Sequence, residues 1–476
     1  MRRRHAAALL GAGVLALGLV LVARAQPYDY PTARPSTAWA NTDAALQHHV
    51  AYTDGSVARA ALLRLNPARF GPSFAFGFFC INHRGGGGGG GAPCAGFLLG
   101  VAVVYCNSGA GITVVTNGVP QVVWSANRAS PVGEGATAEL TADGDLVLKS
   151  PRGAVVWSAG TAGRGVAGMS INSDGNLVMV DGSNRTVWQS FDHPTDTLVV
   201  GQSLRQGARL TANTSFDNWS GSRIYLTVAA DGLAAYVTAK PPQRYYVLGY
   251  NKNAAAYAMY NNGSLTVLDR PGGQPLTTVQ LPAVGAGTVQ YMRLEYDGHL
   301  RLYEWRSNGM KWEAVADVLH PYPDDCAYPT VCGAYGVCTD MQCSCPDAAN
   351  FRAIDFRRPN RGCVPTAPPP TCRSPPPPRR ARAPRLLSLR DMAYFNSRDT
   401  SMRTLERVNE EACKKACLGD CACMAAQFVY GFDPNDGYCY LQSEVLSLET
   451  MRPEIFHYNS TMHIKIAQGK SPRRLF

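Results

Sequence analysis

The stretch SINSDGNLVMVDGSNRTVWQSFD, residues 170–192, contains the pattern that decides the fold. Its Asp-Gly pair at 174 and 175 suits a tight turn between antiparallel strands, because glycine accepts the positive φ angle that such turns require. In the NLVMV that follows, Leu177 and Met179 share one face, and the opposite face carries Asn176, Val178 and Val180. We interpret the stretch as a β-hairpin that ends in Trp188.

The same unit recurs along the chain. VVWSANR, VVWSAGT and TVWQSFD place tryptophans at Trp124, Trp157 and Trp188, with spacings of 33 and 31 residues. An Asp-Gly pair lies upstream of the last two, at Asp143 and Asp174. Three such hairpins can bring their tryptophans to a shared axis, where each ring buries apolar area that one hairpin cannot cover alone. The repeat therefore predicts a three-fold β architecture.

The N-terminus has the pattern of a secretory signal peptide over residues 1–25. Three arginines precede an apolar run at 6–22, and Ala-Arg-Ala at 23–25 forms a small-residue cleavage site. We expect a mature chain that starts near Gln26 and is secreted to the extracellular space or apoplast. The alternative is membrane association at the cell surface through an uncleaved N-terminal segment. Removal of the four arginines in this segment lowers the formal charge from +10 to +6, a modest basic excess.

Fifteen cysteines in a secreted chain indicate disulfides rather than a metal site. Two even blocks, six cysteines at 326–363 and six at 372–439, indicate two separate crosslinked modules. The early cysteines leave one odd thiol, and the sequence does not show which of Cys80, Cys94 and Cys106 it is. Five Asn-x-Ser/Thr sites fit N-glycosylation in the same compartment: Asn184, Asn213, Asn218, Asn262 and Asn459.

The chain resembles the bulb-type lectin domain of plant S-locus glycoproteins and S-domain receptor-like kinases. The resemblance rests on FAFGFF, VVWSANR, DGDLVL, DGNLVM and especially VWQSFDHPTDTLVVGQSL, and it covers about residues 41–204. It implies a β-prism of three sheets in which a Gln-x-Asp-x-Asn-x-Val-x-Tyr strand holds mannose.

The mannose motif is degenerate in this sequence. Its five positions are occupied in one repeat by Asn172, Asp174, Asn176, Val178 and Val180, and in the other by Thr141, Asp143, Asp145, Val147 and Lys149. Replacement of the tyrosine by valine or lysine removes one hydroxyl partner and an aromatic wall. We therefore expect turns with a structural purpose, and a working mannose site is the alternative.

Residues 205–320 resemble the S-locus glycoprotein region, which is often a second, decayed lectin-like prism. Its tyrosines could form an aromatic platform for a sugar or pack between strands, and we favour packing. These tyrosines are Tyr225, Tyr236, Tyr245, Tyr246 and Tyr250. We interpret Asp192-His193 as a hydrogen-bonded turn rather than an acid–base dyad. The glycine run at 85–91 is expected to be a flexible loop, because no helix follows that would bind phosphate.

CGAYGVC at 332–338 and the Cys-x-Cys at 343–345 resemble an EGF-like module of the same plant family, at 326–363. LERVNEEACKKACLGDCACMAAQF at 405–428 resembles the family's PAN/apple domain, at 372–466. A Pro/Arg-rich linker at 364–390, which contains Cys372, is expected to be a spacer, with docking on acidic wall polysaccharide as the alternative. The resemblance implies the pairs Cys326–Cys338, Cys332–Cys343, Cys345–Cys363, Cys413–Cys439 and Cys417–Cys423, which leaves Cys372–Cys421.

We therefore expect a mainly β, multidomain protein with a β-prism lectin domain, a second lectin-like β domain, an EGF-like module and an α+β PAN domain. Neither G-x-S-x-G, nor H-E-x-x-H, nor the motif set of a kinase occurs. The expected function is non-catalytic recognition of protein or glycan partners at the plant cell surface, without cofactor, metal or nucleic acid. The alternatives are a mannose-binding lectin and a kinase-less co-receptor or decoy of an S-domain receptor kinase. Homodimerisation is a further expectation.

Overall fold

The computed structural model describes residues 29–467, apart from positions 47, 82–93, 95, 108–110, 116–119, 216–217, 250–254, 321–323, 368–371, 373–383 and 453. The predicted signal peptide, the glycine run, Tyr250 and most of the Pro/Arg-rich linker lie outside the described residues.

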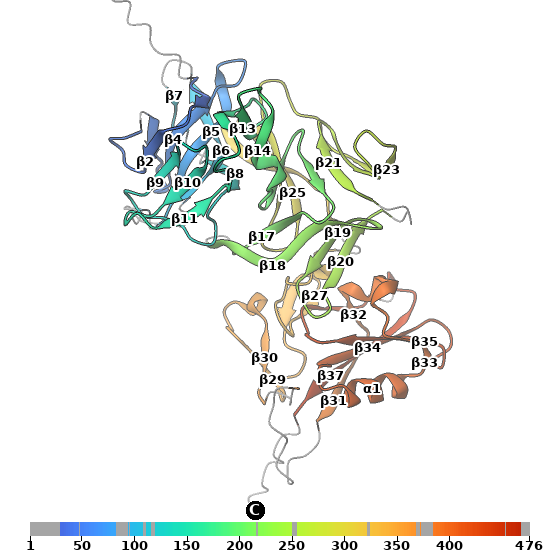
Figure 1. The fold of residues 1–476 in the computed structure, drawn as a ribbon. Coiled ribbons are helices and arrows are strands. Elements are labelled where there is room, and N and C mark those ends of the chain that lie inside the picture. Colours follow the sequence, from blue (N-terminus) through green and yellow to red (C-terminus); the bar gives the residue numbers. More distant parts are fainter. Residues whose placement is uncertain are drawn as a thin grey trace, which may run out of the picture.

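The first module is a β-prism of three antiparallel sheets, in the upper part of Figure 1. One sheet has the order β1 (Thr32–Ala33), β12 (Val166–Ile171), β13 (Leu177–Asp181), β14 (Thr186–Gln189). The second has the order β11 (Val155–Ser158), β10 (Leu146–Lys149), β9 (Thr137–Leu140), β2 (Thr37–Ala40). The third contains β3 (His48–Ala51), β4 (Val57–Arg64), β5 (Phe70–Cys80), β6 (Leu98–Asn107) and β7 (Gly111–Ile112), with β8 (Gln121–Ser125) also paired to β6.

Strand alternation explains how this module buries its apolar residues. On β5, Phe76 and Phe78 face a core that also contains Leu177 and Met179 of β13. Phe79, on the opposite face of β5, belongs to a second buried cluster. Both faces of β5 are therefore covered, which accounts for its nearly continuous apolar sequence.

The second module is another prism, built from three four-stranded antiparallel sheets. The first sheet has the order β15 (Thr197–Val199), β24 (Gln290–Leu294), β25 (Leu300–Arg306), β26 (Lys311–Asp317). The second has β16 (Ser203–Arg205), β21 (Tyr257–Asn261), β22 (Ser264–Leu268), β23 (Pro275–Gln280). The third has β17 (Arg209–Ser215), β18 (Asn218–Ala229), β19 (Gly232–Val237), β20 (Gln243–Leu248).

The boundary between the prisms differs from the predicted one at residue 204. β15 lies before that boundary and β16 crosses it, but they pair with β24 and β21 of the second prism. Their side chains Leu198 and Leu204 are fully buried in the second prism's core. The predicted start at residue 41 is also too late, because β1 and β2 already pair with β12 and β9.

The C-terminal part combines small disulfide-rich hairpins with an α+β unit. The hairpins are β27 (Val337–Thr339) with β28 (Gln342–Ser344) and β29 (Phe351–Ala353) with β30 (Cys363–Pro365). The α+β unit has a sheet of order β31 (Arg385–Arg390), β37 (Asn459–Ile466), β34 (Ala425–Tyr430), β35 (Gly437–Gln442), β33 (Leu405–Val408). Short 3-10 helices are η1 (Ser190–Asp192), η2 (Asp325–Ala327), η3 (Pro359–Arg361), η4 (Phe395–Arg398) and η5 (Thr400–Met402).

Helix α1 (Glu410–Gly419) packs on this sheet and buries Cys413 and Cys417. Its N-cap is Asn409, whose side-chain oxygen accepts a hydrogen bond from the backbone N–H of Ala412 at 2.9 Å.

The two cysteine blocks predicted separate modules, but the segment at 326–363 and the C-terminal module share a sheet. β27 pairs in parallel with β36 (Leu448–Thr450), which pairs in turn with β32 (Met392–Tyr394). One sheet, β28-β27-β36-β32, therefore runs through both modules. This pairing joins segments more than a hundred residues apart, so no local pattern in the sequence announces it.

Seven disulfides crosslink the described residues, and five of them have the pairing that the family resemblance implies. A sixth joins the two cysteines that the resemblance left over, Cys372 and Cys421. The seventh joins Cys80 to Cys94, and Cys106 is the free, buried thiol.

Candidate functional site

The three repeat tryptophans meet, as the sequence predicts. The ring centroids of Trp124, Trp157 and Trp188 lie 5.6–6.2 Å apart, and each pair packs edge to face. Trp124 and Trp188 are buried, but Trp157 is only half-buried. The cluster holds the three hairpins together.

The Asp192-His193 segment caps this cluster. The indole Nε1 of Trp124 donates a hydrogen bond to the backbone oxygen of His193 at 2.9 Å. The imidazole of His193 stacks on Trp188, with ring centroids 5.3 Å apart. Asp192 accepts a hydrogen bond from Gln189 Nε2 at 3.0 Å and pairs with Arg205 at 3.2 Å. The two residues thus serve packing, and no hydrogen bond joins their side chains.

At the first degenerate sugar motif, the side chains are used inside the turn. Asn172 Oδ1 accepts hydrogen bonds from the backbone N–H of Asp174 at 3.0 Å and of Asn176 at 2.9 Å. Asn176 is only 6% exposed, and its Nδ2 donates to Gln189 Oε1 at 2.9 Å. Its Oδ1 accepts from Ser190 Oγ and from a backbone N–H. The amide of Asn176 is therefore committed to the fold.

The other positions of this motif provide few groups that could form hydrogen bonds with a sugar. Asp174 is exposed, and its carboxylate accepts a 3.4 Å hydrogen bond from its neighbour Ser173. Val178 and Val180 are half-buried and provide no hydrogen-bonding group. Asp174 is the one residue of this motif that is exposed.

The polar side chains of the second motif are also used in internal hydrogen bonds and an ion pair. The Asp145 carboxylate accepts hydrogen bonds from Ser158 Oγ at 2.5 Å and from the backbone N–H of Thr161 at 3.0 Å. Thr141 Oγ1 donates to the carboxylate of Asp143 and accepts from the backbone N–H of Asp145. Lys149, at the motif's tyrosine position, forms a 2.7 Å ion pair with Glu139 on the neighbouring strand. Val147 is buried.

The tyrosines of the second prism pack rather than form one exposed platform. Tyr225 and Tyr236 are a cross-strand pair whose rings stack at 5.3 Å, and the Arg209 guanidinium lies over the Tyr225 ring. Tyr245 is buried, and its hydroxyl donates to the backbone oxygen of Gly298. Tyr246 is half-buried beside the same core.

The five glycosylation sequons fall into two groups. Four asparagines are exposed, namely Asn184, Asn218, Asn262 and Asn459. Asn213 is half-buried between the prisms, where its Oδ1 accepts a 2.5 Å hydrogen bond from Arg128. Glycosylation at these positions stays a prediction.

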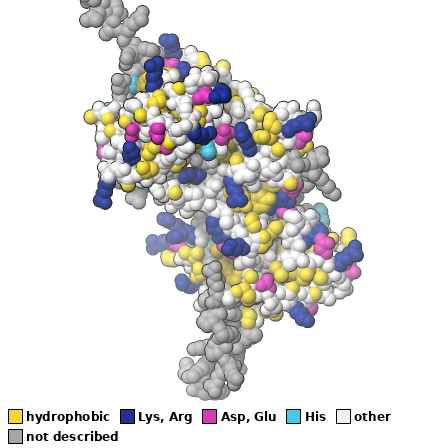
Figure 2. Space-filling model, in the orientation of Figure 1, with side chains coloured by type: hydrophobic (Ala, Val, Ile, Leu, Met, Phe, Trp, Pro, Cys, Tyr) yellow, Lys and Arg dark blue, Asp and Glu magenta, His cyan; other side chains and the backbone are white. Residues whose placement is uncertain are grey.

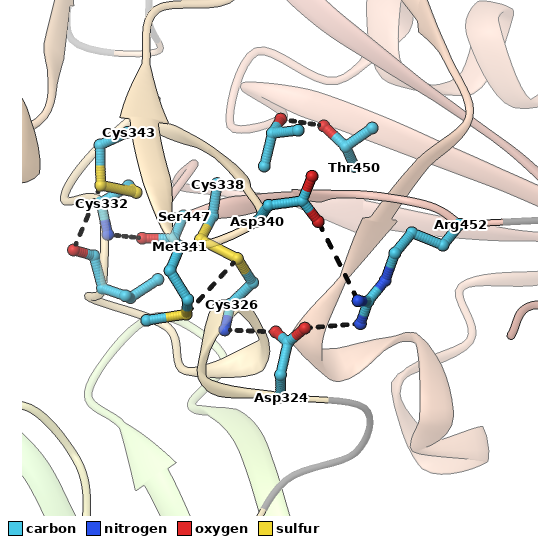
Figure 3. Close-up of a disulfide and its surroundings, with 12 residues drawn as sticks. Asp324, Cys326, Cys332, Cys338, Asp340, Met341, Cys343, Ser447, Thr450 and Arg452 are labelled. Atoms are coloured by element: carbon cyan, nitrogen blue, oxygen red, sulfur yellow. Dashed lines mark hydrogen bonds and ion pairs between the residues drawn. A yellow bond between two sulfur atoms is a disulfide. The ribbon is translucent and has the colours of Figure 1, made fainter.

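The segment at 326–363, which is predicted to be an EGF-like module, is bonded to the C-terminal module around the disulfides in Figure 3. The Arg452 guanidinium forms ion pairs with Asp324 at 2.6 Å and with Asp340 at 4.0 Å. The backbone N–H of Cys332 donates to Ser447 Oγ at 2.8 Å. These contacts, with the shared sheet, fix the two modules relative to each other.

The second prism is attached to the same assembly. Arg244 of β20 forms a 2.6 Å ion pair with Asp399, and Arg223 of β18 pairs with Glu444. Burial alone would raise the pKa of Asp399, but hydrogen bonds from Arg244 and Ser401 lower it. Its carboxylate is therefore charged and holds the guanidinium.

A cleft of about 870 Å³ lies where these modules meet. Its walls combine aromatic, charged and amide side chains, including Arg223, Tyr296, Asp297, His299, Arg301, Asp325, Tyr328, Met341, Asn360 and Arg361. Tyr296 is 43% exposed. The volume is in the range of roughly 300–1,000 Å³ that is typical of ligand sites. The cleft could not be predicted from the sequence, because the second prism, the segment at 326–363 and the C-terminal module each supply part of it.

No group of three or more His, Cys, Asp or Glu side chains within the described residues is placed to hold a metal ion. In the same part of the chain, no helix is long and apolar enough to cross a membrane.

The tandem prisms with a disulfide-rich C-terminal part define a mainly β, lectin-like protein class. Two family models match the chain: the D-mannose binding lectin model at residues 121–220 and the S-locus glycoprotein domain model at 277–352.

Similar proteins include epidermis-specific secreted glycoprotein EP1 of Daucus carota, 30% identical over 49% of this chain and 70% of that protein. EP1-like glycoprotein 2 of Arabidopsis thaliana is 31% identical over 47% of this chain and 57% of that relative. The Arabidopsis G-type lectin S-receptor-like kinase SD2-5 is 24% identical over 71% of this chain and 40% of its own length.

The chain belongs to the S-domain family of bulb-type lectin and S-locus glycoproteins, which includes the EP1-like glycoproteins. Its match spans a little over half the length of EP1-like glycoprotein 2. Among solved structures, the two-domain lectin of Scilla campanulata has 18% identity over 42% of this chain and 81% of that chain, with a TM-score of 0.19. At this TM-score the superposition adds nothing to the assignment.

Proposed function

We propose that this protein is a non-catalytic recognition glycoprotein that acts outside the cell. The observation that supports this most directly is the cleft between the second prism and the C-terminal modules, which combines exposed aromatic surface with charged and amide groups. The ligand is a glycan or a protein segment that enters this cleft. The name of the carrot relative describes it as a secreted glycoprotein, which agrees with an extracellular location.

The mannose motifs are not the binding site in this proposal. The amide of Asn176 and the carboxylate of Asp145 bond to their own turns, so sugar hydroxyls would have to displace these internal hydrogen bonds. In the working domain assignment, residues 326–363 are an EGF-like module and residues 372–466 a PAN/apple domain that supports the cleft wall.

A glycan array and a cross-linking experiment on the secreted full-length chain test this function. Tyr296→Ala should weaken binding of the captured ligand at least tenfold, because it removes an exposed ring from the cleft wall. Phe432→Ala is the matched control, since Phe432 is an exposed aromatic residue outside the cleft lining. Equal loss in both variants, or binding that Tyr296→Ala leaves unchanged, would count against the cleft.

A second candidate is a co-receptor or decoy for an S-domain receptor kinase. Similarity to the G-type lectin S-receptor-like kinases supports it. Co-purification of the secreted chain with the extracellular part of such a kinase would favour this role, and light scattering of the chain alone would detect a homodimer.

A further inference from the structure

The loop between β29 and β30 carries an unusual concentration of positive charge. In FRAIDFRRPNRGC, residues 351–363, four arginines are exposed: Arg352, Arg357, Arg358 and Arg361. We call these four residues the arginine patch. Figure 2 shows dark blue side chains gathered at the edge of the lower half of the molecule, over the loop that Figure 1 places beside β29 and β30.

The charge of the patch is not neutralised from within the described residues. Asp355 is the one acidic residue of the loop, and its carboxylate accepts a 3.0 Å hydrogen bond from the backbone N–H of Arg357. No ion pair to a described carboxylate engages the four guanidinium groups of the patch. Four such cations in ten residues repel one another, so an anionic partner would relieve an unfavourable arrangement.

The loop is held firmly at its base. The Cys345–Cys363 disulfide and a 2.7 Å hydrogen bond from the backbone N–H of Cys363 to the oxygen of Ala334 fix its end. Gly362 has φ +94°, and a Cβ there would lie 2.6 Å from the Ala334 oxygen. Only glycine fits this close approach, which presents the arginines on a pre-organised support.

The patch continues into the cleft described above. Asn360 and Arg361 of the loop line the cleft together with the exposed ring of Tyr296. A pyranose ring can pack its C–H face on such an aromatic ring and hydrogen-bond its hydroxyls to an amide, and a guanidinium binds a carboxylate with two parallel hydrogen bonds. This combination fits a sugar that carries a carboxylate.

We propose that the arginine patch and the adjoining rim of the cleft are a docking surface for an acidic polysaccharide built from uronic acid residues. The carboxylates of successive sugars pair with the arginines, and one sugar ring packs on Tyr296. This inference rests on the proposed recognition function and names the chemical class of its ligand. An acidic peptide or an anionic membrane would use the charge of the patch but would not need the aromatic ring.

The test measures binding of the secreted full-length chain to polygalacturonate at low and at physiological salt. The patch variant replaces Arg352, Arg357, Arg358 and Arg361 by Gln. The control variant makes the same change at four exposed arginines elsewhere, Arg34, Arg152, Arg164 and Arg270. We expect the patch variant to bind at least tenfold more weakly and the control variant to stay within twofold of the unmodified chain. Added salt should weaken binding of the unmodified chain more than that of the patch variant.

Three further probes identify the partner class. With Tyr296→Ala, binding to polygalacturonate should fall at least tenfold and binding to poly-glutamate should not change. Poly-glutamate or phosphatidylserine vesicles that bind the unmodified chain more tightly than polygalacturonate would overturn the proposal, as would equal losses in patch and control variants. A result in which the patch variant binds a neutral β-glucan or a protein in the cleft with full affinity would refute the proposal that the ligand is acidic. It would leave the proposed recognition function intact. Failure of the unmodified chain to bind any glycan or protein would refute both.

Discussion

The indole Nε1 of Trp124 donates a 2.9 Å hydrogen bond to the backbone oxygen of His193, which ties the third hairpin's exit segment to the axis of the first prism. The imidazole of His193 covers Trp188 on the same side. The segment that contains His193, which follows Trp188, therefore closes the first prism before the chain enters β15 of the second prism.

Substitution of a buried tryptophan should destabilise the first prism strongly. We expect Trp188→Ala to cost about 3–5 kcal/mol of unfolding free energy, as is usual for loss of a buried aromatic side chain. Trp157→Ala should cost clearly less, because Trp157 is only half-buried. Thermal melting of the secreted protein checks this order, and Phe432→Ala on the exposed surface should stay within about 0.5 kcal/mol of the original chain. Equal losses at Trp157 and Trp188 would contradict the packing described.

The degenerate turn should contribute to stability rather than to sugar binding. Titration with mannose should show no saturable binding below roughly 10 mM. Asn176→Ala should cost about 1–3 kcal/mol of stability, because it leaves Ser190 and Gln189 without their partner. Asp174→Ala, on the exposed side of the same turn, should change stability by less than about 0.5 kcal/mol. Mannose binding below about 1 mM that both substitutions abolish would show a working lectin site.

The local parts of the fold were predictable because they depend on neighbouring residues. The Asp-Gly turns follow from glycine's freedom, and Gly144 and Gly175 have φ angles of +86° and +82°. The tryptophan cluster follows from the repeat, since three equivalent hairpins place their last residues on one axis.

What the sequence did not reveal depends on pairing between distant segments. The boundary at residue 204 was wrong because the apolar pattern of β15 and β16 does not say which prism buries it. Arg293 shows the same limit: the sequence offers an ordinary strand arginine, but its side chain donates to the backbone oxygen of Val122 in the other prism. The cleft needed three modules in place before its residues became neighbours.

The buried His463 should make the C-terminal module sensitive to mild acid. Its Nδ1 lies 2.8 Å from Ser388 Oγ and its Nε2 lies 3.4 Å from Glu410, at the start of α1. Burial lowers the pKa of His463 from 6.5 to about 4, although the Glu410 carboxylate opposes this shift. The unfolded chain therefore binds a proton below pH 6.5 that the folded chain does not bind until about pH 4. Stability should fall across this window as the pH decreases, by up to about 3 kcal/mol.

Urea unfolding between pH 7 and pH 5 measures this effect before the carboxylates titrate. His463→Gln should flatten the pH dependence, whatever its effect on absolute stability. Phe432→Ala, an exposed substitution without a titratable group, should leave the slope unchanged. A slope that survives in His463→Gln would assign the acid sensitivity to other groups.

The odd cysteine should be chemically silent in the folded protein. Cys106 is fully buried, and burial raises the pKa of its thiol to about 12, against a smaller opposing effect of a hydrogen bond with Ser73. Because the thiolate is the reactive form, a thiol reagent at pH 8 should label no cysteine in the native chain and one after denaturation. Rapid labelling of the native chain would show that Cys106 is accessible, and labelling of several cysteines after denaturation would contradict the seven disulfides.

The ion pair of Arg244 and Asp399 should hold the C-terminal module on the second prism. Both side chains are largely buried, and their closest atoms are 2.6 Å apart. Arg244→Met leaves the Asp399 carboxylate buried without its cation, so we expect a loss of about 3–5 kcal/mol. The pair of Arg185 and Asp181, in which the arginine is exposed, is the control, and Arg185→Met should destabilise the protein much less than Arg244→Met. Urea unfolding gives both values, and limited proteolysis should release the C-terminal module earlier only in Arg244→Met. Similar small losses in the two variants would mean that the shared apolar core, rather than this ion pair, keeps the modules together.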